Sequence, residues 1–353
     1  MSLMDRHEAI ATISSPTSHP TARLPAGQTQ QPPNTELAIT VCIVNWNCVA
    51  YLRECLQSLF QQDQGVPFDV IVVDNASSDG APEMVAQDFP QVTLIRNSAN
   101  VGFSKANNQA ARIATGQYLF FLNNDTVVPA GALAALFKIA QNHPQVGMFG
   151  PQLYDVNGHL QISHRRMPTV AGMLYRTCLF RWVPRFRRDY LAYRSEDFRP
   201  DEQRTVEVLL GAAVLVPRAV YHQCGGWDED FPFGVEDVEY CARIGKKFSL
   251  MHLPSVRIKH YGRVSSRRNV AFSAPSHLKG IVLYFRKTGV SPRKVLLFKL
   301  ALTMDAPITL MAKLLQAGIR LCFNKRQKAK KSILAAYGTW RFLTHDLPSF
   351  WQK

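Results

Sequence analysis

Short runs of apolar, β-branched residues alternate with amphipathic stretches of about a dozen residues from Leu37 onward. This alternation predicts βαβ units around a parallel sheet whose two faces are both covered by helices. We therefore expect an α/β, Rossmann-like, nucleotide-binding fold. The predicted strands span residues 39–44, 70–73, 92–95 and 118–122, and the predicted helices span about 49–62, 80–88, 104–115 and a stretch after Pro129.

The pattern changes on either side of this region. Residues 1–36 are rich in Ser, Thr, Pro and Gln, which predicts a flexible N-terminal arm. Residues 152–204 carry many arginines and aromatic residues without a clear period and predict a long excursion from the sheet. The run Val206–Val216 predicts a buried strand, and Glu236–Ile244 a short helix. A single domain over 37–290 is the simplest organisation.

The C-terminal part has a different composition. Of a formal net charge of +15, all the excess lies from Tyr261 onward, where 18 basic residues face 2 acidic ones. Residues 294–323 predict two amphipathic stretches broken near Asp305 and Pro307, followed by a basic run over 325–331. This combination predicts a membrane-associated tail over 291–353, lying on an anionic surface. Helices packed back on the domain, with a solvated basic end, are the alternative.

Other classes of protein fit the composition less well. Strong aliphatic faces rather than stacking aromatics accompany the basic charge, which disfavours a nucleic-acid tail. No apolar N-terminal segment indicates a signal peptide, and no run of 18 uncharged apolar residues indicates a confident membrane span. The seven cysteines are scattered and predict a reducing compartment. We therefore expect a cytoplasmic protein rather than a secreted one or a channel.

Polar residues follow the ends of the predicted strands, where open α/β sheets bind their ligands. Asp74 follows the second strand, and its carboxylate can accept a hydrogen bond from the imide N–H of a uracil or thymine ring. Asp79 can instead cap the next helix. Asn123, Asn124 and Asp125 follow the strand at 118–122 and suit a divalent cation such as Mg²⁺, although Asp125 can equally be a helix cap.

Further candidates lie between and beyond these strands. Gly102 lets a ligand approach the backbone, and Ser104 is a predicted helix cap, but no G-x-G-x-x-G fingerprint of a dehydrogenase is present. A cluster of acids lies between Asp228 and Glu239, where adjacent carboxylates can raise one pKa for general-base work or form a solvated turn. His260 ends an alternating run, and a lone histidine there is more often structural than a ligand.

Taken in order, these motifs resemble the inverting glycosyltransferase family 2 of the GT-A fold, and most closely its rhamnosyltransferase-like branch. The resemblance covers about residues 38–290. The motifs that carry it are Val44-Asn45-Trp46-Asn47, Asp74-Asn75-Ala76-Ser77-Ser78-Asp79-Gly80, Gly102-Phe103 with Asn107-Asn108, Leu122-Asn123-Asn124-Asp125-Thr126, Gly225-Gly226-Trp227-Asp228-Glu229, Glu236-Asp237-Val238-Glu239 and His260.

The resemblance implies a role for each matching residue. Asp237 would be the general base and Glu236 would orient the acceptor. Asn123 and Asp125 stand at the D-x-D metal motif, here N-x-D, so that Asp125 and His260 would hold Mg²⁺ or Mn²⁺ on the sugar diphosphate. The remaining residues would bind the donor, with Asp74 at the base: Asn45, Asp74, Asp79, Gly102, Asn107 and Asn123. Val235 departs from the glycine that often precedes the Glu-Asp pair.

The implied function is the transfer of one sugar from a nucleotide-diphosphate donor to a lipid-linked or glycan acceptor in cell-surface polysaccharide synthesis. L-rhamnose from a thymidine diphosphate donor is the leading donor, and a uridine diphosphate hexose or galactofuranose is the alternative. A non-catalytic module that binds sugar nucleotide at a membrane is a further alternative. The excursion over 152–204 would line the acceptor side, and the protein would be peripheral on the cytoplasmic face of the membrane. The motifs leave the oligomeric state open.

Overall fold

The structure, a computed structural model, describes residues 37–194, 201–231, 233–262 and 270–352. The predicted N-terminal arm over 1–36 lies outside the described residues. In the described part of the chain, nine strands form a mixed sheet and two more form a small ribbon. The order in the sheet is β3 (Thr93–Arg96), β2 (Phe68–Asp74), β1 (Ile39–Asn45), β4 (Tyr118–Asn123), β10 (Ala213–Pro217), β6 (Val146–Tyr154), β11 (Ser249–His260) and β5 (Thr126–Val127), with β8 (Arg204–Val206) paired to β11.

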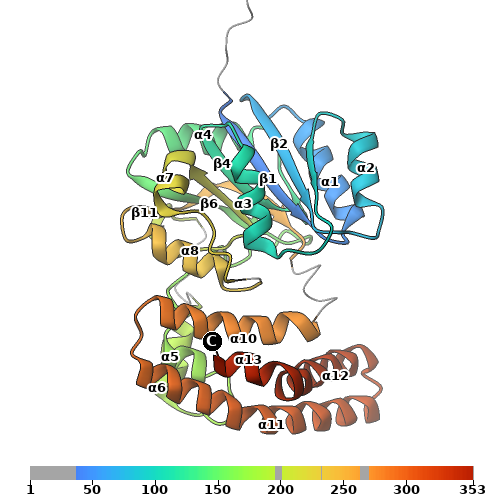
Figure 1. Ribbon diagram of the computed structural model, residues 1–353, viewed down its shortest axis with the longest axis vertical. Coiled ribbons are helices and arrows are strands. Elements are labelled where there is room, and N and C mark those ends of the chain that lie inside the picture. The colour runs from blue at the N-terminus through green and yellow to red at the C-terminus, as the bar shows by residue number, and fades with distance from the viewer. Residues whose placement is uncertain (1–36, 195–200, 232, 263–269, 353) are drawn as a thin grey trace, which may run out of the picture. The chain divides into compact units, whose positions relative to one another are not determined.

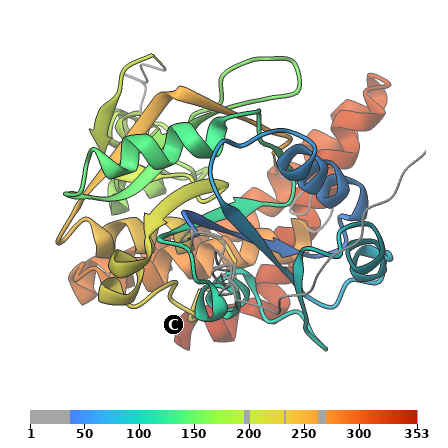
Figure 2. The same ribbon diagram turned by 90° about the horizontal axis from the view of Figure 1, so that it is seen from above.

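The N-terminal half of the sheet follows the predicted βαβ pattern. β3, β2, β1 and β4 are parallel, so their carboxyl ends lie at one edge (Figure 1). Figure 2 views the same strands from above, with the blue strands on one side and orange β11 on the other. The helices between them are α1 (Val49–Phe60), α2 (Ala81–Asp88), α3 (Phe103–Ile113) and α4 (Ala132–Gln141). The predicted helices are thus confirmed, although α4 begins after Gly131 rather than at Pro129.

Alternate strand residues enter two separate buried clusters, as expected for a sheet covered on both faces. Val41 and Ile43 pack with α1, α2 and α4, whereas Cys42 packs with α3. The second face is also covered by α7 (Arg218–Cys224) and α8 (Glu236–Ile244). The bounds of α8 match those of the predicted helix. Ser104 lies inside α3 and donates a hydrogen bond to the Phe231 carbonyl (3.0 Å), so its prediction as a helix cap is wrong.

The predicted single strand over Val206–Val216 is wrong, because its residues are divided among three strands with different partners. β8 pairs with β11, and β10 pairs antiparallel with β4 and β6. Between them, β9 (Val208–Leu209) pairs with β7 (His164–Arg165) in the two-stranded ribbon. The chain turns at Gly211, whose N–H donates to the side chain of Asp237. Apolar residues throughout the run concealed these changes of partner.

The C-terminal helices also differ from expectation, because α11 (Pro292–Cys322) is continuous through the predicted break. A proline inside a helix costs about 3 kcal/mol, so neighbouring contacts must offset it. The Asp305 carboxylate accepts hydrogen bonds from the Leu179 N–H (3.0 Å) and the Thr309 hydroxyl (2.8 Å). The helices that surround α11 are α5 (Val170–Leu174), α6 (Pro184–Tyr193), α10 (Val270–Lys287), α12 (Arg326–Arg341), a π-helix (Phe342–Asp346) and α13 (Leu347–Gln352).

These helices share a hydrophobic core with one face of the sheet. Phe298 and Leu302 of α11 belong to the same buried cluster as Phe285 of α10 and Val235, the residue before α8. A side chain on Gly280 of α10 would lie 2.6 Å from the Gly234 carbonyl oxygen, so α10 contacts the loop before α8 directly. The expected excursion over 152–204 contributes α5 and α6 to this group, with residues 195–200 outside the described part (Figure 1).

Candidate active site

The loop after β2 is organised around the carboxylate of Asp74. Asp74 is level with Asn45 at the ends of the paired strands β2 and β1. It accepts hydrogen bonds from the Asn45 side-chain amide (3.0 Å), the Ser77 hydroxyl (2.6 Å) and the Ser77 N–H (2.8 Å). Asp74 is buried, and these donors satisfy it as a buried carboxylate requires. Its predicted contact with the nucleotide base stays a prediction.

A second contact extends this network to the end of β4. The side-chain oxygen of Asn45 accepts a hydrogen bond of 2.6 Å from the buried amide of Asn124. Asn45 thus bridges the loops after β2 and β4, and these hydrogen bonds fix its side chain. Its role in donor binding stays a prediction. Asn124 has no sequence signal distinct from those of Asn123 and Asp125, between which it stands.

The other predicted donor residues lie around the same edge. Both carboxylate oxygens of Asp79 accept from backbone N–H groups, of Val49 at the start of α1 (2.8 Å) and of Ala81 at the start of α2 (3.3 Å). The capping role is therefore observed, and a donor contact stays a prediction. Gly102 has φ of +90°, a conformation that favours glycine, and its carbonyl accepts from the Asn75 side chain (3.2 Å).

Asn107 lies one turn into α3 and is buried. Its side-chain amide donates to the Phe103 carbonyl (3.1 Å), which is a bond within the same helix. The neighbouring Asn108 is more heavily engaged, since it bonds both backbone polar groups of Trp227 and the Tyr221 hydroxyl. Asn108 therefore ties α3 to the Gly-Gly-Trp segment, whereas the donor role of Asn107 stays a prediction.

Asp125 and His260 are brought together by strand pairing. β5 pairs antiparallel with the end of β11, so that Thr126 is level with His260 and the Tyr261 N–H donates to the Asp125 carbonyl (2.9 Å). The His260 Nε2 then lies 3.4 Å from Asp125 Oδ1, and both side chains are buried. Residues 135 positions apart in sequence thus face each other, as the resemblance implied.

Gln161 fixes the orientation of His260. Its amide donates to the His260 carbonyl (2.8 Å), and its carbonyl oxygen accepts from His260 Nδ1 (2.9 Å). With the proton on Nδ1, Nε2 presents a lone pair toward Asp125, and it has no hydrogen-bond partner among the described residues. Histidine ligands of metals are commonly held in this way through their other nitrogen.

The donor set at this position fits a divalent cation shared with a substrate. One carboxylate and one imidazole nitrogen face each other, and Mg²⁺ usually takes only one or two carboxylates and completes its shell with phosphate oxygens. Within the described residues, no group of three or more His, Cys, Asp and Glu side chains forms a closed metal site. The pair is therefore suited to a cation that arrives with a diphosphate rather than to a permanently bound metal.

The acids between Asp228 and Glu239 separate into two groups. Asp228 and Asp230 both form ion pairs with Lys287 of α10. Glu239 forms a two-pronged ion pair with Arg243, with contacts of 2.8 Å and 2.7 Å. Glu229 accepts from the Asn108 amide (3.0 Å). These four acids all have side-chain partners, which leaves Glu236 and Asp237 as the two acids of the cluster that bond to no other side chain among the described residues.

Glu236 and Asp237 have different environments at the start of α8. The Glu236 Oε2 is buried and has no hydrogen-bond partner in the described part of the chain. Burial, and secondarily the charge of Asp237, raise the pKa of Glu236 to about 8. Asp237 instead accepts from the Gly211 N–H (3.3 Å) and the Val238 N–H (2.9 Å). Burial thus favours the protonated form of Glu236, beside a carboxylate that backbone N–H groups hold in place.

Gly211 connects this acid pair to the end of β4. The next residue, Ala212, accepts a hydrogen bond from the Asn123 N–H (2.8 Å), and a Cβ on Gly211 would lie 3.1 Å from that of Asp237. Asn123, at the first position of the N-x-D motif, is therefore one short segment away from Asp237. The motifs did not reveal Gly211 or Gln161, because Gly211 is concealed within an apolar run and Gln161 lies in a segment without a regular pattern.

Comparisons with known proteins agree with this arrangement. A family model described as glycosyl transferase family 2 matches residues 40–201. The chain is 30% identical over 258 residues to the N-acetylglucosaminyl-diphospho-decaprenol L-rhamnosyltransferase of Mycobacterium tuberculosis, covering 70% of this chain and 83% of the relative. It is 28% identical over 220 residues to the O-antigen biosynthesis protein RfbC of Myxococcus xanthus, covering 61% of this chain and 16% of that one.

A solved structure shows the same architecture. The mannosyltransferase PcManGT of Pyrobaculum calidifontis, in complex with GDP-Man and Mn²⁺, superimposes with a TM-score of 0.50 at 20% identity, over 90% of this chain and 91% of that one. The mixed sheet, the ordered motifs and these matches confirm the predicted GT-A fold. The chain belongs to glycosyl transferase family 2.

Proposed function

We propose that the chain is an inverting, cation-assisted enzyme that moves one L-rhamnose from a thymidine diphosphate donor to a polyprenyl-diphosphate-linked glycan. The observation that carries the chemistry is the pairing of Asp237, held by the Gly211 N–H, with the buried carboxyl of Glu236, whose pKa is raised, one short segment from the end of β4. The choice of sugar and acceptor is supported by the rhamnosyltransferase relative, of which the chain covers 83%.

Asp125 and His260 would hold the cation. When bound, a divalent cation supplies positive charge against the diphosphate that leaves the sugar. The Gln161 contacts keep His260 Nε2 directed toward Asp125, so the two ligands would need little rearrangement. Asp74, Asn45 and Ser77 would keep the loop after β2 in place under the nucleotide base.

Asp237 would take the proton of the acceptor hydroxyl. As that oxygen attacks the anomeric carbon from the side opposite the diphosphate, the configuration inverts and the enzyme forms no covalent intermediate. The protonated carboxyl of Glu236 can donate a hydrogen bond to the acceptor and orient it. The Gly211 N–H donates to one oxygen of Asp237, so the backbone fixes the orientation of this carboxylate.

The test is a donor and acceptor screen with the full chain. We expect release of thymidine diphosphate when thymidine diphosphate rhamnose, a diphosphate-linked N-acetylglucosaminyl lipid and Mg²⁺ or Mn²⁺ are supplied together, and loss of release with a chelator. Turnover only with a uridine diphosphate sugar would contradict the donor assignment. Binding of sugar nucleotide without turnover of any donor, tested with lipid extract as acceptor, would favour a non-catalytic module.

We also propose that α11 attaches the protein to the cytoplasmic face of an anionic membrane. Within the described residues, α11 is the one helix long and apolar enough to cross a membrane. One of its faces is packed in the protein, where Lys299 and Asp305 are buried. The opposite face exposes apolar side chains at helical spacing, namely Leu297, Leu300, Met304, Ile308, Met311 and Leu315. A helix with one packed and one bare apolar face suits the surface of a bilayer.

The charge next to α11 supports the same orientation. The basic residues of the following segment are exposed, and they would attract anionic lipids. This cluster consists of Lys325, Arg326, Lys328, Lys330 and Lys331.

Vesicle flotation tests the attachment. Since burying one large aliphatic side chain is worth about 1.5–3 kcal/mol, we expect the double variant Met304→Glu, Leu315→Glu to bind phosphatidylglycerol vesicles at least about tenfold more weakly. Ile113→Glu, an exposed apolar position on α3, is the matched control. Equal loss for both variants, or no loss for either, would contradict attachment through α11.

A further inference from the structure

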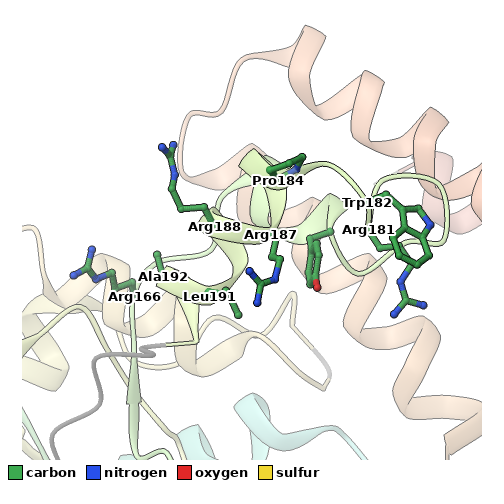
Figure 3. Close-up of a pocket in the computed structure, with 9 residues that line it drawn as sticks. Arg166, Arg181, Trp182, Pro184, Arg187, Arg188, Leu191 and Ala192 are labelled. Carbon is green, nitrogen blue, oxygen red and sulfur yellow. The ribbon is translucent and has the colours of Figure 1, made fainter.

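A large cavity on α5 and α6 is lined by arginines. Its volume is about 780 Å³, and it lies in the segment between β7 and the end of α6. Figure 3 shows Arg187 between Arg166 and Arg188 on one side and Arg181 with Trp182 on the other. We call it the arginine cavity. The side chains that line it include Arg166, Tyr175, Arg181, Trp182, Arg187 and Arg188.

The chemistry of this lining favours a multiply charged anion. Four guanidinium groups line the cavity and no carboxylate does, although Arg188 also contacts Asp189 at 3.4 Å. Like charges held on one concave surface repel each other unless an anion lies between them. Guanidinium groups bind phosphate oxygens through two parallel hydrogen bonds, which makes arginine better suited than lysine to phosphate groups.

The cavity adjoins a second one that reaches the middle of α11. A second cavity of about 400 Å³ shares Tyr175 and Arg181 with the first and is lined on its other side by Thr309, Lys313 and Gln316 of α11. The neighbouring side chains Met311 and Leu315 are 67% and 68% exposed. Trp182, at the rim, is 82% exposed, and an exposed tryptophan suits the boundary between lipid and water. An anion here can therefore carry a long apolar chain.

The same segment leads back to the acid pair. Arg166 follows β7, and the next N–H, of Met167, donates to the Glu207 carboxylate (2.7 Å) just before β9. Gly211, which holds Asp237, is four residues beyond Glu207, at most about 14 Å of extended chain. The segment that carries Arg166 is thus tied to the loop that holds Asp237.

We propose that the arginine cavity binds the diphosphate of a polyprenyl-diphosphate-linked acceptor, with the polyprenyl chain along α11 and the glycan toward Asp237. The inference rests on the proposed function for the identity of the acceptor. Its physical basis is independent of the donor: four arginines, a second cavity that reaches α11, a helix with exposed apolar side chains, and the connection through Glu207 and Gly211 to Asp237. The printed name of the mycobacterial relative describes an acceptor of this chemistry.

Vesicle binding by the full chain tests the cavity without requiring turnover. Phosphatidylcholine vesicles would be doped with a polyprenyl diphosphate, with the matching polyprenol, or with phosphatidylglycerol, and inorganic pyrophosphate would be added as a competitor. Hydrogen bonds to charged groups are among the stronger ones, so we expect at least tenfold tighter binding to the diphosphate than to the polyprenol. We also expect Arg181→Ala and Arg187→Ala each to weaken that binding about tenfold.

Arg185→Ala is the matched control, because it removes the same charge from α6 at an exposed residue that does not line the cavity. Equal losses for Arg185→Ala and Arg187→Ala would overturn the proposal, as would binding to phosphatidylglycerol as tight as to the diphosphate. Competition by free pyrophosphate as strong as by the lipid would assign the site to a soluble anion instead and would also overturn it.

Kinetics separate this proposal from the proposed function. With a diphosphate-linked acceptor, Arg187→Ala is expected to raise the acceptor KM about tenfold while kcat changes less. A wild-type chain that turns over no sugar nucleotide, yet binds diphosphate vesicles in the expected order, would refute the proposed function and support the cavity. Normal turnover with an unchanged acceptor KM in Arg187→Ala would refute the cavity and support the proposed function.

Discussion

The carboxylates of Asp74 and Glu236 both have buried oxygens, but they differ in how these oxygens are hydrogen-bonded. Asp74 accepts three hydrogen bonds from Asn45 and Ser77, whereas Glu236 has a buried oxygen without a partner in the described residues. The loop after β2 is therefore a satisfied and rigid support. The start of α8 instead keeps a carboxyl in a costly environment, which is where a reactive group is expected. Substitutions in the loop after β2 and at the start of α8 test the two sides of this contrast.

Asp237→Asn is expected to have the largest effect. It keeps the shape of the side chain and removes the anion that would take the acceptor proton, so turnover should fall by about 10²–10⁴-fold. Donor affinity should stay within about threefold, because the donor would be held at the loop after β2 and by Asp125 and His260. Steady-state turnover and a thermal-shift titration with donor measure the two quantities. Collapse of donor affinity as well would contradict the role of Asp237 as a base.

Glu236→Gln should remove a pH dependence of stability at α8. The pKa of Glu236 is raised from 4.5 to about 8, so the folded chain binds this proton more tightly than the unfolded chain. The stabilisation is complete below about pH 4.5 and is lost as the pH rises through 8. Since each pKa unit is worth about 1.4 kcal/mol, the stability of the variant relative to the wild type should rise by up to about 5 kcal/mol between pH 4.5 and pH 9.

Urea unfolding of Glu236→Gln and wild type at pH 5 and pH 9 measures this difference. Glu229→Gln, an acid with a hydrogen-bond partner on the surface, is the control and should show little pH-dependent change. A variant whose stability relative to wild type is the same at both pH values would show that Glu236 is ionised in the folded chain.

Asp74→Ala should destabilise the loop after β2. The substitution leaves the Asn45 amide and the Ser77 N–H without their acceptor in a buried site, so the free energy of unfolding should fall by about 2 kcal/mol. Donor affinity should fall with it. Ser78→Ala, on the exposed part of the same loop, is the matched control. Unchanged stability in Asp74→Ala would mean that the satisfied network does not support the loop.

Gly280→Ala tests whether the C-terminal helices support the acid pair. Its Cβ would lie 2.6 Å from the Gly234 carbonyl, so α10 must move, at a cost of about 1–2 kcal/mol, and turnover should fall. Gly318→Ala in α11 meets no atom within 4 Å and should stabilise the helix by up to about 1 kcal/mol. Thermal unfolding of both variants measures the difference. If Gly280→Ala also stabilised the chain, the contact between α10 and Gly234 would not constrain the loop.

The parts that could be predicted from sequence are those fixed by local pattern. Alternating apolar runs define β1, β2 and β4, and polar residues at their ends define the edge where Asn45, Asp74 and Asp125 lie. The contact of Gln161 with His260 joins residues 99 positions apart and leaves no local pattern. Neither does the division of residues 204–217 into three strands with different partners.

The continuity of α11 was missed for a related reason. Proline and aspartate inside an apolar run predict a break, but tertiary contacts decide the outcome. Leu179 and Thr309 donate to Asp305, and packing against α5 and α12 keeps the helix intact through Pro307. The left-handed conformation of Val235, with φ of +77°, likewise depends on its buried surroundings and is not visible in the residue itself.

The ion pairs from Lys287 to Asp228 and Asp230 have a practical consequence for biochemistry. A chain shortened to remove α11 and everything after it would keep Lys287 but would strip Phe298, which packs against Phe285 with ring centroids 5.4 Å apart, from the helix that holds the lysine. Activity lost on such truncation would report a loosened loop before α8 together with the loss of α11 itself. Point substitutions on the exposed apolar side of α11 are therefore the cleaner way to test the proposed attachment to lipid.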